Sequence, residues 1–110
     1  MLYFEHSGFR IVMGQNQSDN VQILQNAEQN DLWCHINELS SSHAIVVNPD
    51  NNRIPNKTKR FCCLKIKQYS NKCKNIDNLS FCVTKVNNIV HRGEALVEFT
   101  NMDNVQYITI

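Results

Sequence analysis

The chain has 110 residues and a mass of 12.8 kDa, which suits one compact domain spanning residues 1–110. Hydrophobic residues make up 42% and charged residues 19%, a globular composition that excludes a disordered chain or a fibrous repeat. The formal net charge is only +1, so charge-driven binding must depend on a local patch rather than on the average charge.

The sequence also indicates a compartment. Its start shows no basic segment followed by an apolar stretch, and no apolar run approaches the roughly 18 residues that span a bilayer. The five cysteines form an odd set without regular spacing, which is typical of a reducing compartment. We therefore expect a cytoplasmic protein without membrane contact.

Turn and cap signals organise the first quarter of the chain. Residues 2–4 and 9–13 are predicted to form a short hairpin, with Ser7-Gly8 as its turn. Ser18-Asp19 offers N-cap chemistry for a short helix over residues 20–27.

Two strands are expected next. Residues 31–36 alternate as a half-buried strand does, with Trp33 and His35 on one face and apolar side chains on the other. A polar loop over residues 37–42 follows. The apolar run 43–47 then predicts a second strand, which an Asn-Pro-Asp turn closes.

A longer helix and a β-rich end complete the chain. Pro55 suits the first turn of a helix, and residues 56–71 have helical spacing. Three further strands are predicted over residues 79–86, 95–100 and 105–110. The resulting order, ββαββαβββ, defines an α+β domain with two helices and a mixed, largely antiparallel sheet.

The second predicted helix concentrates the positive charge of the chain. Seven of the eleven basic residues lie between positions 57 and 74, and no Asp or Glu interrupts them. They are Lys57, Lys59, Arg60, Lys65, Lys67, Lys72 and Lys74.

Helical geometry separates these charges from an apolar stripe. At about 100° per residue, four side chains share a narrow core-facing stripe: Cys62, Ile66, Tyr69 and Cys73. Most of the basic residues spread over the opposite side, with Lys59 as the outlier, and Phe61 lies among them. The prediction is a cationic face that carries an aromatic residue.

Two interpretations of this face stay open. The cations could neutralise phosphates and release counterions, and Phe61 could stack on a base. Alternatively, the helix is a solvated surface element whose lysines keep the protein soluble, with Phe61 buried under the rim of the sheet.

His35 and His43 invite a chemical interpretation. With Asp31 nearby, the pair could form an acid–base or zinc site, but its spacing matches no zinc pattern and the chain has no Cys-x-x-Cys. Whether the rings face each other depends on strand register. We predict a structural role instead, with His43 bonded to the serine loop 40–42 and His35 packed beside Trp33.

Other catalytic signals are absent from the sequence. It has no Ser-His-Asp order, glycine-rich phosphate loop or Walker motif. The vicinal pair Cys62-Cys63 is best read as small buried hydrophobes, since a disulfide between helical neighbours would be strained. The sequence therefore predicts neither an enzyme nor a bound metal or cofactor.

The central motif resembles that of a known family. Residues 30–36, Asn-Asp-Leu-Trp-Cys-His-Ile, a loop, and then Ser42-His43 before an apolar strand resemble the signature of the NFACT-R domain. Gly14-Gln15-Asn16, Phe61-Cys62-Cys63 and Tyr69-Ser70 resemble its flanking elements, so the likeness spans nearly the whole chain. The loop Leu39-Ser40-Ser41 is more similar to single-domain relatives of the coiled-coil domain-containing protein 25 type than to the large multidomain members.

The resemblance implies binding rather than catalysis. Large members of the family act in ribosome-associated quality control and contact the large ribosomal subunit and tRNA, whereas the single-domain relative is associated with DNA. The matching motif positions in this chain are Asp31, Trp33, His35, Ser42 and His43. On this basis Asp31 and His35 are expected to hold the loop, with His43 and the basic helix nearer the ligand.

Three functions follow from the sequence. The first is a domain that binds structured RNA, such as tRNA or ribosomal RNA, and possibly DNA, through Lys57, Arg60, Phe61, Lys65, Lys67, Lys72 and Lys74. The second is a protein-interaction module whose loop 37–42 docks a ribosomal or coiled-coil partner. The third is a degenerate nuclease that uses Asp31, His35 and His43.

Overall fold

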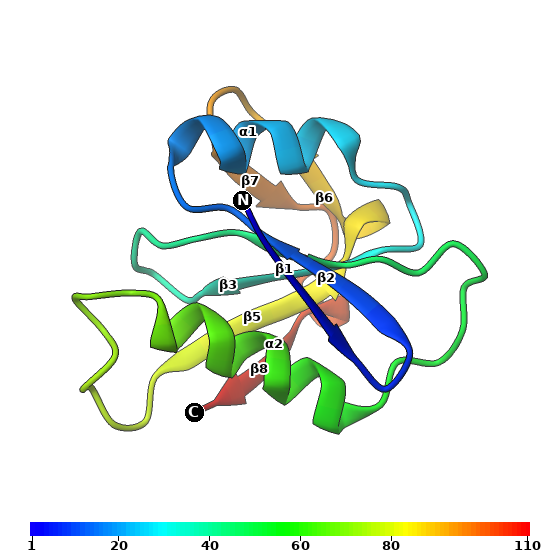
Figure 1. Ribbon diagram of the computed structural model, residues 1–110. Helices are drawn as coiled ribbons and strands as arrows, with labels where there is room; N and C mark the ends of the chain where they lie inside the picture. Colours follow the sequence, from blue (N-terminus) through cyan, green and yellow to red (C-terminus); the bar gives the residue numbers. More distant parts are fainter.

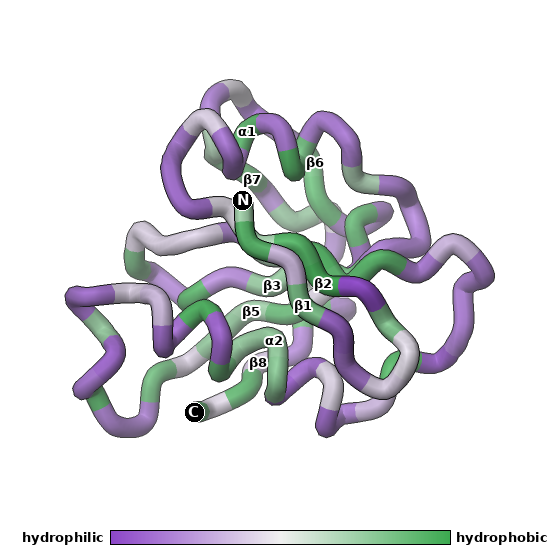
Figure 2. The backbone as a smooth tube through the Cα atoms, viewed as in Figure 1, coloured by the Kyte–Doolittle hydropathy of each residue, from purple (hydrophilic) through white to green (hydrophobic).

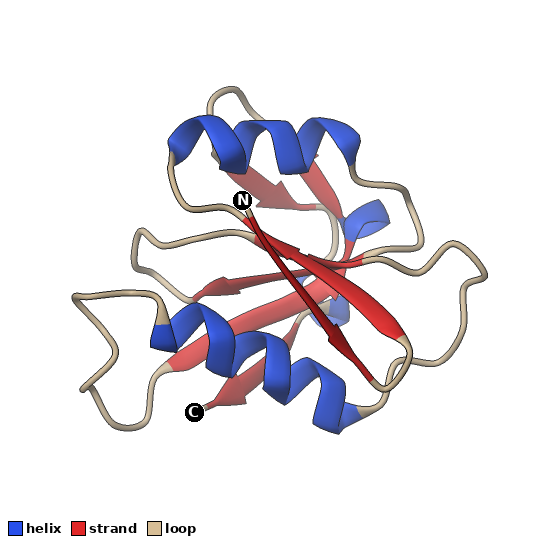
Figure 3. Ribbon diagram, in the orientation of Figure 1, coloured by secondary structure: helices blue, strands red, loops and turns tan.

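The computed structural model describes residues 1–110, and every strand pairing in it is antiparallel (Figure 3). The elements are β1 (Leu2–His6), β2 (Phe9–Met13), α1 (Gln17–Asn26), β3 (Leu32–Ile36), β4 (Ala44–Val46), α2 (Asn56–Gln68), β5 (Ser80–Lys85), η1 (Val86–Asn88), β6 (Ile89–His91), β7 (Val97–Phe99), η2 (Met102–Asn104) and β8 (Gln106–Thr109). The predicted α+β class, with two helices and the predicted order of elements, is confirmed. The structure adds the short strand β6 between β5 and β7.

The strands form one large sheet and one small hairpin. The large sheet has six strands in the order β1-β2-β4-β3-β5-β8, and β6 pairs with β7 separately. Figure 1 shows the β6–β7 hairpin lying behind α1, while α2 crosses the large sheet near β5 and β8. Neither helix combines the length and the apolar character needed to cross a membrane.

The β1–β2 hairpin follows from its turn residues. Ser7 and Gly8 both have positive φ, at 51° and 83°, and His6 pairs directly with Phe9. A two-residue turn with left-handed backbone at both positions matches the right-handed twist of the strands on either side. The predicted turn is confirmed.

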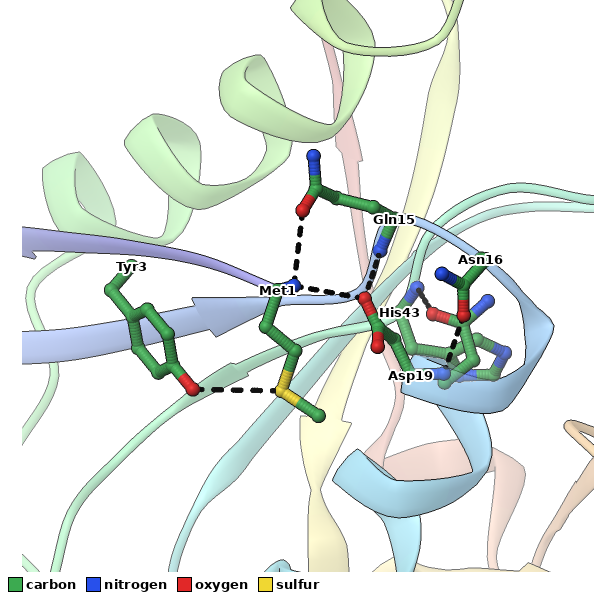
Figure 4. Close-up of polar contacts among 7 residues, drawn as sticks. Met1, Tyr3, Gln15, Asn16, Asp19 and His43 are labelled. Atoms are coloured by element: carbon green, nitrogen blue, oxygen red, sulfur yellow. Dashed lines mark hydrogen bonds and ion pairs between the residues drawn. The ribbon is translucent and has the colours of Figure 1, made fainter.

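Helix α1 begins earlier than the sequence signals suggested. Asn16 is the N-cap, and its side chain accepts a hydrogen bond from the Asp19 backbone N–H at 2.8 Å. The Asp19 carboxylate in turn accepts from the Gln15 N–H and lies 3.0 Å from the amine of Met1 (Figure 4). The predicted cap at Ser18-Asp19 is therefore wrong, because Asn16 accepts from a backbone N–H group at the start of the helix that would otherwise have no partner.

Alternation along the strands divides the core into two layers. The odd and even side chains of the central strands point to opposite faces, one covered by α2 and the other by α1 and the β6–β7 hairpin. In β3, Leu32, Cys34 and Ile36 join the α2-side core, whereas Trp33 joins the α1-side core. The predicted separation of faces is confirmed, but β3 is covered on both sides rather than half-buried.

Hydropathy along the chain reflects this arrangement. Figure 2 shows hydrophobic segments in the central strands and hydrophilic segments in the loops at the rim. Two cysteines that the sequence placed in the core, Cys62 and Cys73, are buried against the sheet together with Ile66. The α2 helix thus buries one stripe and leaves the rest of its surface to solvent.

Candidate functional site

The cations on and just after α2 pair with no Asp or Glu side chain. The ion pairs of the protein join the Met1 amine to Asp19 and Arg92 to Glu98, and neither involves a residue of this region. We call this region the α2 basic face, and its members are Lys57, Lys59, Arg60, Lys65, Lys67, Lys72 and Lys74.

Three of these side chains contact oxygen atoms of β8 or of the residue that follows it. The Lys59 Nζ donates a hydrogen bond to the Gln106 amide oxygen at 3.0 Å, and the Lys67 Nζ donates to the Ile110 carbonyl oxygen at 3.1 Å. The Arg60 guanidinium lies 3.4 Å from the Thr109 carbonyl oxygen. The Gln106 and Thr109 acceptors are neutral, so they leave the positive charges of Lys59 and Arg60 uncompensated.

A second group of contacts joins α2 to β1. The ring of Phe61 stacks on His6 with 4.5 Å between centroids and meets Phe4 edge-on at 6.3 Å. The Lys65 Nζ lies over both phenylalanine rings, at 5.2 and 5.3 Å from their centroids. With Tyr69, whose ring is 5.9 Å from Phe4, these residues form what we call the aromatic–lysine cluster. Phe61 is thus engaged inside the protein, partly buried between β1 and α2.

The end of α2 differs from the prediction. The helix ends at Gln68, and Lys72 and Lys74 lie in the following turn, 71–75, rather than on the helix. Tyr69 is the C-cap and is 54% exposed, so its predicted place on the core stripe is wrong. Helical projection fails here because the backbone has left the helix by the time it reaches these residues.

Strand register answers the question that the sequence left open about the two histidines. Trp33 pairs with Ile45 and Cys34 with Ala44, so the next step of the same ladder sets His35 opposite His43. Their ring centroids are 4.5 Å apart. His35 also stacks on Trp33 with an interplanar angle of 4°, as predicted.

Hydrogen bonds define the protonation of both rings. The Trp33 Nε1–H donates to His43 Nδ1 at 2.9 Å, so the neutral His43 ring carries its proton on Nε2. The predicted bond from His43 to the serine loop is therefore wrong, because the indole N–H takes its place. His35 Nδ1 lies 2.6 Å from the Ile36 carbonyl oxygen and donates to it.

Burial keeps both imidazoles neutral. Burial and, to a smaller extent, the charge of neighbouring His35 together lower the pKa of His43 to about 3. Burial likewise lowers the pKa of His35, against hydrogen bonds to backbone groups that raise it. The pair thus forms a closed, uncharged network rather than an exposed acid–base dyad.

Sequence reasoning missed Asn20, which holds the backbone of His43. Its side-chain oxygen accepts a hydrogen bond from the His43 N–H at 3.1 Å, while the Gly14 N–H donates to the His43 carbonyl oxygen at 3.1 Å. A Cβ added to Gly14 would lie 2.2 Å from the Asn20 side-chain oxygen. Gly14 is therefore required for close approach, and Figure 4 shows His43 beside the start of α1.

Asp31 fixes two loops. Its carboxylate accepts from the Asn48 N–H at 2.8 Å and from the Glu28 N–H at 2.9 Å, and the side chain is buried. These bonds tie the segment after β4 to the segment before β3. Asp31 therefore does not hold the loop 37–42, as had been expected.

A polar cleft of about 660 Å³ opens beside the histidine pair. It lies on the α1 side of the sheet, between the start of α1, the loop 37–42 and the turn between β6 and β7. Its charged lining residues are two glutamates, Glu38 and Glu94, and no Lys or Arg lines it. Ser42 lies at its wall and His43 at its buried floor.

The structure therefore separates two sets of predicted residues. The motif residues Trp33, His35 and His43 belong to the α1 side of the sheet, whereas the basic residues lie on the α2 side. His43 is only 3% exposed, so it does not adjoin a ligand bound on the α2 basic face.

The cysteines offer no nucleophile. All five are buried free thiols. Hydrogen bonding with Cys62 and burial raise the pKa of Cys34 well above the usual range. Hydrogen bonding with Cys34 and burial likewise raise the pKa of Cys63. Thiols that stay protonated pack as small apolar groups.

Comparison with known proteins identifies relatives. Residues 1–98 match the profile of the NFACT protein RNA binding domain. No curated protein matches the chain. Among solved structures, the chain is similar to the C-terminal part of the fibronectin/fibrinogen-binding protein from Streptococcus suis, with a TM-score of 0.81 and 16% identity. That alignment covers 98% of this chain and 44% of the other, and at this identity it establishes a shared fold.

Proposed function

Because this chain belongs to the NFACT protein RNA-binding domain family, we propose that it binds structured RNA, such as tRNA or ribosomal RNA, through the α2 basic face. The observation that carries the proposal is a set of seven cations that pair with no Asp or Glu in a chain whose net charge is only +1. The acidic residues lie elsewhere, so the charge is strongly asymmetric. An asymmetric charge orients a protein toward a polyanion.

Phosphate contacts would supply most of the affinity. Lysine and arginine side chains that neutralise phosphates release condensed counterions, which makes binding steeply dependent on salt. The neutral oxygens that accept from Lys59 and Arg60 position these cations without quenching their charge. Lys57, which is exposed on the first turn of α2, extends the same surface.

The domain acts as a binding module rather than an enzyme. The side chains of Asp31, Trp33 and His43 bond to one another or to the backbone, and burial raises the pKa of the Cys34 and Cys63 thiols. No three His, Cys, Asp or Glu side chains gather where they could hold a metal ion. A reaction on the bound RNA would need an exposed acid, base or metal beside the α2 basic face.

The family context supports a more specific setting. We propose a role in translation or ribosome-associated quality control, with the large ribosomal subunit as a partner in the cytoplasm. The loop Leu39-Ser40-Ser41 supports placing the chain with the single-domain, coiled-coil domain-containing protein 25 type. For that type duplex DNA is the competing polymer, so each binding experiment includes both.

Charge reversal tests the proposal. The triple variant Arg60→Glu/Lys65→Glu/Lys67→Glu should lower the affinity for total tRNA by at least about 100-fold in fluorescence anisotropy, because three cations become repulsive. Duplex DNA at matched concentrations shows which polymer is preferred. Circular dichroism confirms that the triple variant is folded.

A matched pair of double variants controls for net charge. Lys65→Glu/Lys67→Glu and Arg10→Glu/Arg92→Glu change the formal charge equally, but only the first pair lies on α2. The first should weaken tRNA binding far more than the second. Equal losses, or unchanged binding by the triple variant, would rule out the α2 basic face as the RNA site.

The polar cleft favours a second candidate function, the docking of a protein partner. It lacks basic side chains, and its rim carries two exposed leucines, Leu39 at 46% and Leu96 at 65%. Carboxylates beside exposed apolar side chains suit a basic peptide segment of a ribosomal or coiled-coil protein.

Purified large ribosomal subunits and deproteinised ribosomal RNA separate the two functions. If the domain binds the subunit through a protein partner, Leu39→Asp/Leu96→Asp abolishes co-sedimentation with subunits, and the wild-type protein does not bind deproteinised ribosomal RNA. If RNA dominates, the cleft variant binds both as the wild type does.

A further inference from the structure

Tyr69 is the exposed aromatic ring of the aromatic–lysine cluster. It is 54% exposed at the C-terminal end of α2, and its hydroxyl makes no hydrogen bond within the protein. Its ring is tilted by 50° against Phe4, with 5.9 Å between centroids. The Tyr69 ring therefore packs against Phe4 while much of its surface is exposed to solvent.

The other aromatic rings on the α2 side already pack against side chains of the protein. Phe4 and Phe61 pack against the core, and Phe61 also stacks on His6. The other exposed tyrosines, Tyr3 and Tyr107, pair with Val12 and Cys82, which belong to the core on the α1 side. Directly paired residues share a face of the sheet, so both of these tyrosines lie on the face opposite α2.

Lys65 lies four residues before Tyr69, whose backbone N–H donates to the Lys65 carbonyl oxygen at 3.1 Å. Its Nζ is 5.2 Å from the centroid of the Phe4 ring, which also contacts Tyr69. The Lys65 ammonium group and the exposed Tyr69 ring therefore both contact the ring of Phe4. A nucleotide offers the complementary pair, a phosphate and a base separated by one ribose.

We propose that Tyr69 stacks on an unpaired base of bound RNA while Lys65 contacts the adjacent phosphate, so that the domain favours RNA with exposed bases over uninterrupted duplex. This inference rests on the proposed function and adds the structural class of RNA that the α2 basic face selects. Aromatic side chains gain affinity from a base only when its face is free, because the bases of a duplex are stacked on each other.

Binding to two RNAs tests the preference. The probes are a fluorescent 12-nucleotide oligo(A) RNA and a blunt RNA duplex of the same length. Tyr69→Ala should weaken oligo(A) binding by about 5- to 150-fold and leave duplex binding within about twofold, because stacking contributes roughly 1–3 kcal/mol per base. Tyr69→Phe keeps the ring and should bind as the wild type does.

Tyr107→Ala is the matched control, because Tyr107 is 49% exposed but lies on the other face of the sheet. It should change neither affinity. Equal weakening of both RNAs by Tyr69→Ala, no weakening of either, or the same loss in Tyr107→Ala would overturn the stacking role. If the wild-type protein bound neither RNA, the proposed function itself would fail.

Photocrosslinking provides a readout on the unmutated protein. RNA that contains 5-iodouridine is crosslinked to the wild-type protein, which is then digested with trypsin. Tyr69 falls in the tryptic peptide 68–72 and Phe61 in the peptide 61–65, each without another aromatic residue. Crosslinks in 68–72 support the stacking role, whereas crosslinks confined to 61–65 or to peptides from the α1 side contradict it.

Discussion

On the α1 side of the sheet Trp33 and His43 bond to each other, whereas on the α2 side the cations contact amide and backbone oxygens and aromatic rings but no Asp or Glu. Trp33, His43 and Asn20 form a chain of hydrogen bonds that reaches the backbone of β4. Lys65 and Lys67 have no such closed network. The first arrangement engages the indole of Trp33 and Nδ1 of His43 within the fold, and the second leaves charge that a polyanion can neutralise.

The motif residues and the residues proposed to bind RNA are therefore different sets, on opposite sides of the sheet. The Asp-x-Trp-x-His pattern marks the family, yet Asp31 and Trp33 are 4% and 2% exposed. Their chemistry stabilises the centre of the fold. The proposed binding surface lies on α2, where charge and exposure matter more than exact spacing.

The largest expected effect comes from removing Trp33. Its indole packs against Phe99 and both histidines and donates to His43. Trp33→Ala should lower the free energy of unfolding by about 3–5 kcal/mol, measured by urea denaturation. Lys57→Ala, a control on the exposed helix surface, should stay within about 0.5 kcal/mol. A loss below about 1 kcal/mol for Trp33→Ala would contradict a structural role for the motif.

Gly14→Ala should have the next largest effect. The added methyl group would meet the Asn20 side chain, and displacing that side chain frees the His43 N–H. We expect a loss of about 1–3 kcal/mol in urea denaturation. In an Asn20→Ala background the same change should cost less, because the clashing atoms are gone. Simple additivity of the two substitutions would show that the contact does not matter.

The histidine network predicts that stability falls in mild acid. The pKa of His43 is lowered in the folded protein from 6.5 to about 3, so the unfolded chain binds more protons between these values. The contribution is complete above pH 6.5 and shrinks as the pH falls, by about 2 kcal/mol between pH 7.5 and 5. His43→Asn keeps an acceptor for Trp33 but does not titrate there. A pH dependence as steep in this variant as in the wild type would place the effect elsewhere.

The smallest effects belong to single cations beyond the end of α2. Lys72→Ala and Lys74→Ala should each weaken tRNA binding about two- to threefold without changing stability, because each removes one screened phosphate contact. Arg10→Ala, on the other face, is the control and should not alter affinity. A tenfold loss from either lysine would mean that the turn, rather than the helix, is the centre of the interface.

Local signals were enough to predict much of the fold. The Ser7-Gly8 turn, the alternation in β3 and the helical spacing after Pro55 each depend on neighbours in the sequence. They are set by backbone preference and by the period of the apolar residues. For these elements the sequence-based prediction and the structure agree.

The features that the sequence did not reveal depend on distant contacts. The pairing of His35 with His43 is set by the register across the loop 37–43, and the approach of Gly14 to Asn20 requires α1 to fold back on the sheet. The exposure of Tyr69 follows from the end of α2 at Gln68, which no glycine or proline marks. Helical projection alone therefore placed Tyr69 on the wrong side.

The salt dependence of tRNA binding tests the role of the α2 basic face most directly. The slope of log Kobs against log salt concentration is measured for the wild type, Arg60→Gln/Lys65→Gln/Lys67→Gln and the control Arg10→Gln/Arg92→Gln. Removing three phosphate contacts should make the slope shallower by about two to three, while the control keeps the wild-type slope. An unchanged slope in the triple variant would contradict the assignment of RNA binding to α2.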